Sequence, residues 1–269
     1  MEWSAASEIN WRCHEKNSLI PDRQTQRWRI IVRTIDILMT IQFLHPSHRL
    51  ATLIAASTAL IAAPLGAEDE SIQIHEDFSK GIDHWSFTED AAWSRKEHES
   101  HGHVLCLTKK KSDYKPPHRS PLSIAILDEV AMGSFTMTLK VMTTEPHYGH
   151  RDLCLFFGHQ GPDKFYYVHL GQKTDPRANQ IFIVNEAPRT KISEKTTKGT
   201  KWQEDGHWHD VKLVRDAESG KIEVYFDDME NPAMTATDKT FASGKIGVGS
   251  FDDRGCFADI RIEGVKVEK

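Results

Sequence analysis

The stretch GHWHDVKLVRDAESGKIEVYFDD, residues 206–228, carries the clearest fold signal in the chain. In its second half Ile222, Val224 and Phe226 are separated by single, more polar residues. Successive side chains of a strand leave opposite faces of the sheet, so this period of two predicts a half-buried antiparallel strand. The turn-forming residues Glu218–Gly220 precede it, which predicts that the two halves of the stretch are separate strands.

The same alternation recurs along most of the chain after residue 70. Residues 135–141 and 258–262 repeat it, and Gly-Pro and Asn-Pro pairs separate alternating segments. No segment sustains the 3.6-residue period of an amphipathic helix, and no internal repeat is present. The sequence therefore predicts an all-β fold, a two-sheet antiparallel sandwich. Further strands are expected at 71–78, 103–108, 122–127, 152–159, 164–170, 179–185, 208–215 and 244–251.

Composition excludes several classes of protein. The chain has 269 residues, of which 39% are hydrophobic and 27% charged, which suits one large domain with a core and excludes wholesale disorder. It contains no uncharged apolar run of about twenty residues, which excludes a polytopic membrane protein. The formal net charge of −5 argues against a dedicated nucleic-acid binder.

The N-terminal part has the layout of an export signal. A basic stretch is followed by an apolar Ala/Leu/Ile run and then by small residues before residue 68. We expect residues 39–67 to be a signal peptide and residues 1–38 to be an upstream extension from a start codon assigned too early. The alternative, an uncleaved anchor, would have to span roughly 30 Å of hydrocarbon with an apolar run of only about fourteen residues. The sequence therefore predicts a secreted or periplasmic, cell-envelope domain at residues 68–269, without membrane attachment after cleavage.

Three cysteines lie in this domain, Cys106, Cys154 and Cys256. In an exported protein they can form at most one internal disulfide, which leaves one thiol over. All three lie in apolar, strand-like stretches, so three buried thiols are the alternative to a bridge. The residues leave this choice open, and they predict no oligomeric state.

Motifs in the C-terminal third resemble those of a known fold family. The stretch 206–228, with Gly244–Gly249 and Cys256–Ile262, resembles the pattern G-x-W-H-x-V … G-x-I-x-V-Y-x-D-G … G-x-I-G-L … F-D-D-I of concanavalin-A-like, laminin-G-like jelly rolls. The resemblance implies a jelly-roll sandwich over most of residues 71–267. It implies a function only as a class, because this fold carries lectins, glycosidases and adhesion modules alike.

Within that family, the chain looks most like secreted bacterial domains grouped with the 3-keto-disaccharide hydrolases. Those domains carry a strand pair of the form S-G-I-F-F-R … G-Y-E-V-Q-I, whose approximate counterparts are Leu153–His159 and Phe165–Leu170. Tyr167 stands where that pattern has an acidic residue, and His159 stands near its arginine.

Polar and aromatic residues gather on three neighbouring segments, at 151–159, 165–169 and 179–189. A sugar site needs rings against the CH faces of the sugar and planar polar groups for its paired hydroxyls. The sequence therefore predicts sugar binding on this sheet face, whereas the alternative is an ordinary polar, solvent-facing sheet. The candidate contacts are Arg151, Asp152, His159, Tyr167, His169, Gln180, Asn185 and Arg189.

Two classes of function follow. The first is a secreted carbohydrate-binding or glycan-processing protein, and the alternative is a non-catalytic laminin-G-like module that binds a protein partner through its loops. Whether bonds are broken stays open, because no pair of carboxylates has the spacing that glycoside hydrolysis uses. For an enzyme, a hydrolase or lyase of glycosidic bonds, Tyr167 and His169 are the candidate proton-transfer pair.

Four aspartates are candidate ligands of a structural calcium ion. Asp252 and Asp253 lie in an Asp-Asp-Arg-Gly segment, Asp259 follows it, and Asp77 could join them if the first and last strands are neighbours. Carboxylate oxygens are the ligands that calcium prefers. The alternative is a solvated turn, and no other cofactor is expected.

Overall fold

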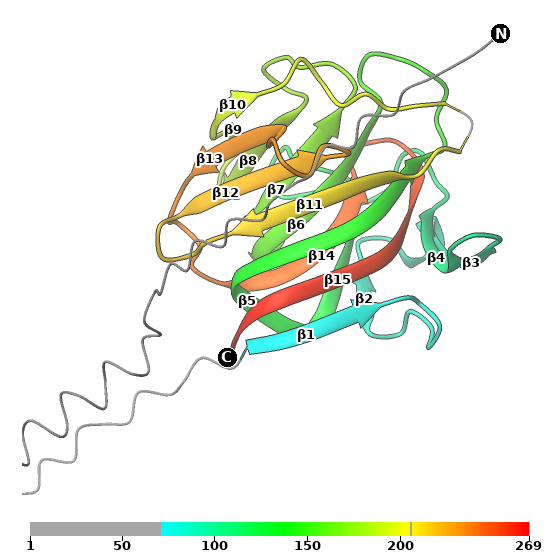
Figure 1. Ribbon diagram of the computed structural model, residues 1–269, viewed down its shortest axis with the longest axis horizontal. Helices are drawn as coiled ribbons and strands as arrows, with labels where there is room; N and C mark the ends of the chain where they lie inside the picture. The colour runs from blue at the N-terminus through cyan, green and yellow to red at the C-terminus, as the bar shows by residue number, and fades with distance from the viewer. Residues whose placement is uncertain (1–70, 205, 269) are drawn as a thin grey trace, which may run out of the picture. The chain divides into compact units, whose positions relative to one another are not determined.

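The computed structural model describes residues 71–204 and 206–268, which are drawn in colour in Figure 1. These residues are all β, apart from turns and one short 3-10 segment, η1 (Asp90–Ala92). The expected upstream extension and signal peptide, residues 1–38 and 39–67, lie outside the described residues. Among the described residues, no helix has the length and apolar character needed to cross a membrane.

The described residues form fifteen strands. They are β1 (Ser71–Glu76), β2 (Trp85–Phe87), β3 (Trp93–His98), β4 (Gly102–Leu107), β5 (Ser123–Thr143), β6 (Asp152–Gly161), β7 (Lys164–Gly171), β8 (Gln180–Asn185), β9 (Thr190–Lys191), β10 (Ser193–Thr196), β11 (His209–Arg215), β12 (Lys221–Phe226), β13 (Met234–Thr237), β14 (Gly244–Ser250) and β15 (Gly255–Val267).

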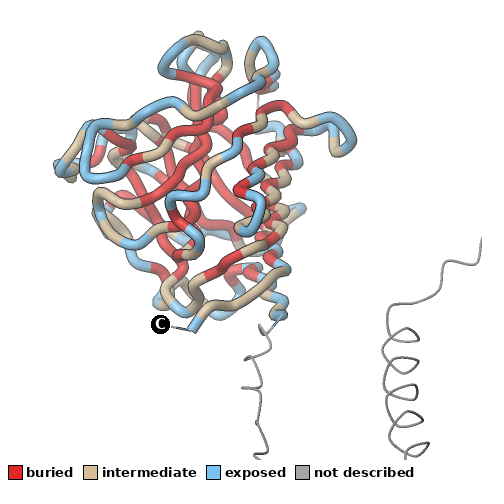
Figure 2. The backbone as a smooth tube through the Cα atoms, turned by 90° about the vertical axis from the view of Figure 1, so that its left-hand side faces the viewer, coloured by how far each residue is buried: buried red, intermediate tan, exposed pale blue. Residues whose placement is uncertain are grey.

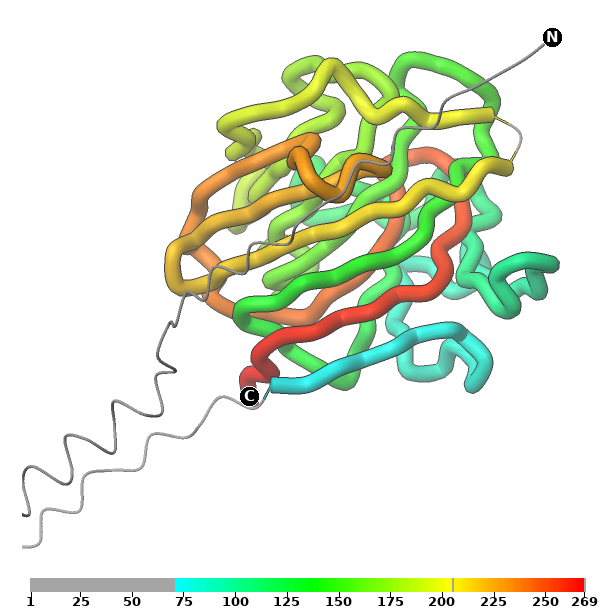
Figure 3. Tube along the Cα trace, viewed as in Figure 1, coloured from blue at the N-terminus to red at the C-terminus, as the bar shows by residue number. Residues whose placement is uncertain are grey.

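The long strand β5 joins the two layers of the fold. Its first half, Ser123–Met132, pairs with β14 on one side, and its second half, Phe135–Thr143, pairs with β11 and β15. The first half belongs to the sheet that we call the front sheet, which is the one farther from the viewer in Figure 1, in the order β2-β5-β14-β6-β7-β8-β9. The second half belongs to the back sheet, in the order β10-β13-β12-β11-β5-β15-β1, with β4 and β3 beside the start of β15. Every pairing between strands is antiparallel, and β1 runs along β15 at the edge (Figure 3).

The main core lies between the two sheets. On β7, Tyr166, Val168 and Leu170 point into it, whereas the alternate residues Tyr167 and His169 point to the outer face of the front sheet. Buried residues run through the middle of the fold, and exposed residues are concentrated in the connections (Figure 2).

The outer face of the front sheet is buried as well. A second apolar cluster covers it, made of Ile124, Ile126, Cys154, Phe156, Phe165, Tyr167, Phe182 and Val184. The connection between β4 and β5, residues 109–122, is bonded to this side of the fold, because the carbonyl of Arg119 accepts a hydrogen bond from the Arg189 N–H. In this 109–122 loop Tyr114, Pro116 and His118 are half-buried, in alternation with exposed neighbours, so one side of the loop faces the protein.

The predicted all-β architecture is confirmed, and its segments correspond to strands of the structure. The segments expected at 122–127 and 135–141 are parts of one strand, β5, because the acidic stretch between them continues extended with a shift of register against β14. The sequence missed five short strands, β2, β3, β9, β10 and β13. Four of them, β2, β9, β10 and β13, have only two to four residues, which is too short for alternation to identify a strand. The fifth, β3, has six residues.

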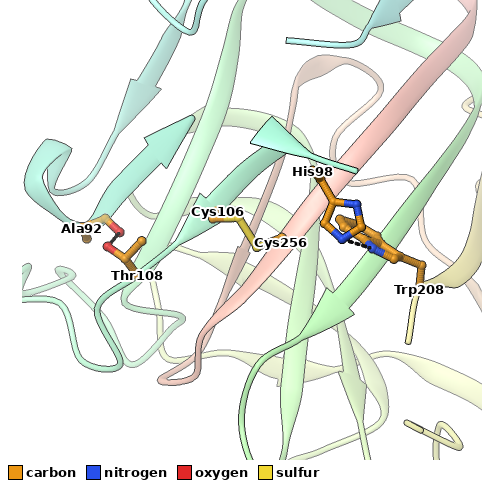
Figure 4. Close-up of a disulfide and its surroundings, with 6 residues drawn as sticks. All are labelled: Ala92, His98, Cys106, Thr108, Trp208 and Cys256. Carbon is orange, nitrogen blue, oxygen red and sulfur yellow. Dashed lines mark hydrogen bonds between the residues drawn. A yellow bond between two sulfur atoms is a disulfide. The ribbon is translucent and has the colours of Figure 1, made fainter. Parts of the chain in front are cut away.

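Of the two possibilities for the cysteines, one disulfide with one free thiol is the one found in the structure. Cys106 on β4 and Cys256 on β15 are directly paired across the two strands and form a disulfide, with Cα atoms 4.1 Å apart (Figure 4). Cys154 is a buried free thiol on β6. The disulfide therefore fastens the β3–β4 hairpin to the back sheet.

Candidate functional site

Arg151, at the start of the predicted sugar face, has a structural role in the fold. Its side chain is buried, and its guanidinium donates to the backbone carbonyls of Glu145, Trp202 and Gln203 and to the side chain of Gln172. These acceptors tie the β5–β6 connection to the segment before β11. The guanidinium is thereby turned toward the protein rather than toward a ligand.

Tyr167, His169 and Gln180 also lie inside the protein. They are 0%, 5% and 5% exposed, which corrects the expectation of a solvent-facing platform: the 109–122 loop and the Arg189 side chain occupy that side of the sheet. Burial raises the pKa of Tyr167 well above its ordinary value and lowers the pKa of His169 to about 3. Because both side chains are buried, neither is placed to exchange a proton with a ligand in solvent. The role of Tyr167 and His169 as a proton-transfer pair stays a prediction.

His159 and Asn185 lie at the opposite end of the front sheet. His159 follows Asp152 by seven residues on β6, about 23 Å along the strand. It lines a hollow of about 580 Å³ together with Asp128 and Lys245, and its ring stacks on Phe165. The predicted sugar contacts therefore do not form one site.

We expect the imidazole of His159 to stay neutral down to about pH 4. Burial, followed by the nearby positive charge of Lys245, lowers its pKa to about 4, whereas an unfolded histidine titrates near 6.5. Because the folded pKa is the lower one, the neutral form stabilises the fold above pH 6.5, and this stabilisation is lost as the pH falls from 6.5 to 4. Because the ring is only half-buried, solvent screens part of the effect, and we expect the free energy of unfolding to fall by about 2 kcal/mol.

An NMR titration of the imidazole signals, with unfolding in urea at pH 7 and pH 4, measures this effect. The variant His159→Gln should lose less stability on acidification than the wild-type protein. A His159 signal that titrates near pH 6.5 would contradict the burial of this ring.

Arg189 instead lines a second hollow, on the outer side of the front sheet. Its volume is about 410 Å³. It lies where the 109–122 loop, the β7–β8 connection and the β8–β9 connection meet. We call it the cationic hollow, and its lining residues are Arg119, Pro176, Arg177, Phe182, Pro188, Arg189 and Lys191.

Arg189 is held at the base of this hollow. Its Nη1 donates to the Tyr167 hydroxyl at 2.6 Å, and its guanidinium lies 4.6 Å from the ring centre of Phe182 and 4.5 Å from that of Phe251. Arg119 lies over the other partner, 5.4 Å from the Phe251 ring centre. Stacking of this kind fixes a planar guanidinium while leaving donors for a ligand.

The lining of the cationic hollow contains four cationic side chains and no acid. Among the described residues, none of the four is in an ion pair. The acid nearest in sequence, Asp175, is directed to the backbone N–H groups of Arg177 and Ala178. No ion pair within the described part of the chain therefore neutralises the positive charge of the hollow.

The predicted calcium ligands separate into two groups. Asp77 is exposed and bonded to Ser79, and Asp259 pairs with His75 and Arg261, so these two aspartates lie apart from the others.

Asp252 and Asp253 are instead joined by Asp152, which the sequence placed in the sugar site. Ligand atoms of the three carboxylates lie within 4.8 Å of one another. Burial raises the pKa of Asp152 to about 7 and the pKa of Asp253 to about 6. Sequence spacing could not reveal this group, because β6 and the β14–β15 connection meet only through the pairing of β6 with β14.

The arrangement of strands is found in solved lectin structures. The winged bean acidic lectin, complexed with methyl-α-D-galactose, matches with a TM-score of 0.50 and 15% identity, over 74% of this chain and 100% of the lectin. This is the concanavalin-A-like lectin fold. The match shows the fold alone.

Two further solved structures are similar at a lower level. Carbohydrate-binding module CBM66 from Bacillus subtilis has a TM-score of 0.46 and 15% identity, over 66% of this chain and 94% of the module. Domain 4 of AbnA, a GH43 extracellular arabinanase from Geobacillus stearothermophilus in complex with arabinotriose, has a TM-score of 0.42 and 13% identity, over 68% of this chain and 84% of that domain. No family model and no curated protein matches the chain, so the resemblance to the 3-keto-disaccharide hydrolases stays a prediction.

Proposed function

We propose that the protein is a secreted or periplasmic carbohydrate-binding protein, and that its ligand is an acidic polysaccharide held at the cationic hollow. The observation that carries the proposal is the lining of this hollow, which has an aromatic ring, no acid and four cationic side chains that form no ion pair with any described residue. The whole chain has a net charge of −5, so this concentration of positive charge runs against its overall sign. A local field of this kind attracts anionic ligands.

The chemistry of the side chains fits carboxylated or sulfated sugars. Arginine presents a planar fork of donors that matches a carboxylate or a sulfate, and hydrogen bonds between charged groups are stronger than neutral ones. Arg189 is already fixed by Tyr167, Phe182 and Phe251, so little side-chain entropy is lost when it binds a ligand. Arg177 and Lys191 are exposed at the rim and supply charge that a chain of sugars can reach.

The fold and the disulfide agree with this function. The winged bean lectin that shares the fold is complexed with a galactoside, which supports a sugar as the ligand of this protein. The bridge between Cys106 and Cys256 is of the kind that forms and persists outside the cytosol, which supports export through the expected signal peptide at residues 39–67.

The alternative is a module that binds an acidic protein segment at the same hollow. The hollow's charge attracts either ligand, so the binding experiment has to separate the two. Bond cleavage is not included in the proposal, because the proton-transfer pair suggested by the sequence is buried.

Calorimetric titration of the purified protein with oligogalacturonate tests the proposal. We expect binding that weakens as salt rises from 50 to 300 mM, because the attraction is between charges. A heparin oligosaccharide in a second titration distinguishes sulfate from carboxylate recognition. The matched control is the same oligogalacturonate after reduction of its carboxyl groups, which should bind at least tenfold more weakly.

Two results would contradict the proposal. Equal affinity for the acidic and the carboxyl-reduced sugar would mean that charge does not select the ligand. Absence of binding to either acidic oligosaccharide, with binding of polyglutamate, would favour the protein-partner module.

A further inference from the structure

Three carboxylates meet at the end of the front sheet. Asp152 begins β6, and Asp252 and Asp253 lie in the connection between β14 and β15. One ligand atom of each lies within 4.8 Å of the others. Asp152 and Asp253 are 0% exposed, whereas Asp252 is half-buried and gives the group a side open to solvent.

One oxygen of this group has no partner. Asp152 Oδ2 accepts hydrogen bonds from the Phe251 N–H, the Ser250 hydroxyl and the Cys154 thiol. Asp152 Oδ1 is equally shielded and accepts none among the described residues. A buried carboxylate oxygen without a donor is costly, because the loss of water is not compensated. The Asp152 carboxylate lies beside two further carboxylates, and the two observations together favour a bound cation.

The charges around the three aspartates also favour a bound cation. Lys110 lies 3.0 Å from Glu145 and 3.5 Å from Asp253, and Arg254 lies 2.7 Å from Glu145. Two cations therefore face four carboxylates, those of Glu145, Asp152, Asp252 and Asp253. The nearby Arg151 is directed to backbone carbonyls, and Arg189 is bonded to Tyr167. When all four carboxylates are ionised, a surplus of two negative charges remains, which is the charge of one divalent cation.

We propose that Asp152, Asp252 and Asp253 form a calcium site, in which Asp152 Oδ1 and the carboxylates of Asp252 and Asp253 are ligands. Calcium takes six to eight oxygen ligands in flexible geometry, so water on the solvent side of Asp252 completes the shell. Magnesium is the weaker occupant, because it requires near-ideal octahedral geometry that ligands held by β6 and by a separate connection do not impose.

The site is connected to the cationic hollow through Phe251. The Phe251 N–H donates to Asp152 Oδ2 at 3.0 Å, and both Arg119 and Arg189 lie over the Phe251 ring. An ion that fixes Asp152 and the β14–β15 connection fixes this ring as well. Calcium therefore positions the two arginines for ligand, and this second step rests on the proposed function.

The first experiment concerns the metal alone. The protein is stripped with EDTA, dialysed and titrated calorimetrically with CaCl₂, and the melting temperature is followed in parallel. We expect saturable binding and a rise in melting temperature, with weaker binding of MgCl₂. The variant Asp252→Asn should reduce calcium affinity at least tenfold. It removes a half-buried carboxylate that accepts no hydrogen bond from the residues the structure describes, and circular dichroism checks that the variant folds.

The matched control is Asp83→Asn, an exposed aspartate away from the group, which should bind calcium like the wild-type protein. Absence of calcium binding to the stripped wild-type protein would overturn the proposal. So would an unchanged affinity in folded Asp252→Asn.

The second experiment measures the coupling. Oligogalacturonate is titrated into stripped and calcium-loaded protein, and we expect at least fivefold tighter binding with calcium in the wild-type protein and no difference in Asp252→Asn. Calcium binding without an effect on sugar affinity would overturn the coupling and leave the metal site. Calcium binding without any acidic sugar binding would contradict the proposed function instead, so the two failures are distinguishable.

Discussion

Replacing both bridged cysteines, Cys106→Ala with Cys256→Ala, is expected to lower the free energy of unfolding by about 4 kcal/mol. The disulfide closes a segment of 150 residues and so restricts the unfolded chain. Without it, the unfolded chain gains conformational entropy, which favours unfolding. The folded state is weakened as well, because only three residue pairs hold β4 against β15. The β3–β4 hairpin should therefore open before the rest of the sandwich.

Unfolding in urea measures this loss. The double variant is compared with the wild-type protein under oxidising and reducing conditions, and reduction should lower the stability of the wild-type protein but not that of the double variant. The matched control is Cys154→Ala, which removes a buried thiol without a bridge and should cost about 1–2 kcal/mol in both conditions. A double variant within 1 kcal/mol of the wild-type protein would mean that the bridge does not stabilise this fold.

Reversing two charges at the rim of the cationic hollow, Arg177→Glu with Lys191→Glu, should weaken acidic oligosaccharide binding by at least 100-fold. Each side chain is exposed and in no ion pair of the described residues, so its loss removes attraction for the ligand without leaving a buried partner. A charge-assisted hydrogen bond contributes about 1.5–3 kcal/mol, and two of them account for a change of this size. The introduced carboxylates add repulsion.

The two readouts of this variant separate binding from folding. Its melting temperature should stay within about 2 °C of the wild-type value, because surface substitutions of this kind change stability by only about 0.5 kcal/mol. The matched control is Lys195→Glu with Lys201→Glu, two exposed lysines that do not line the hollow, which has the same change of net charge. Equal loss of affinity in both double variants would show that net charge, and not this hollow, attracts the ligand.

The sequence predicted the fold well because strand alternation is a local signal. Each of Ile222, Val224 and Phe226 reports its own face of β12, and no knowledge of distant residues is needed. The length of β5 was missed for a related reason: its central acidic residues interrupt the alternation, although the backbone there remains extended.

The candidate site was predicted only in part, because it depends on connections between strands. Arg189 was identified from the sequence, and it lines the cationic hollow. Arg119, Arg177 and Lys191 were not, because they come together only when the 109–122 loop meets the β7–β8 and β8–β9 connections. The burial of Tyr167 has the same origin. Alternation assigns it to the outer face correctly, but it cannot show that this face is covered.

The acidic group at the end of the front sheet illustrates the same limit. The adjacent pair Asp252 and Asp253 is visible as a motif, and so is Asp152 as a polar residue at the start of a strand. Only the pairing of β6 with β14 brings the three together, and it leaves Asp77 and Asp259 elsewhere.

The most direct test of sugar binding at the cationic hollow is a crystal structure determined from crystals soaked with trigalacturonate. We expect the sugar in the cationic hollow, with a carboxylate within hydrogen-bond distance of Arg119, Arg177 or Arg189 and a sugar ring near Phe182. Sugar density on another surface, or an empty hollow at a saturating concentration of trigalacturonate, would contradict it.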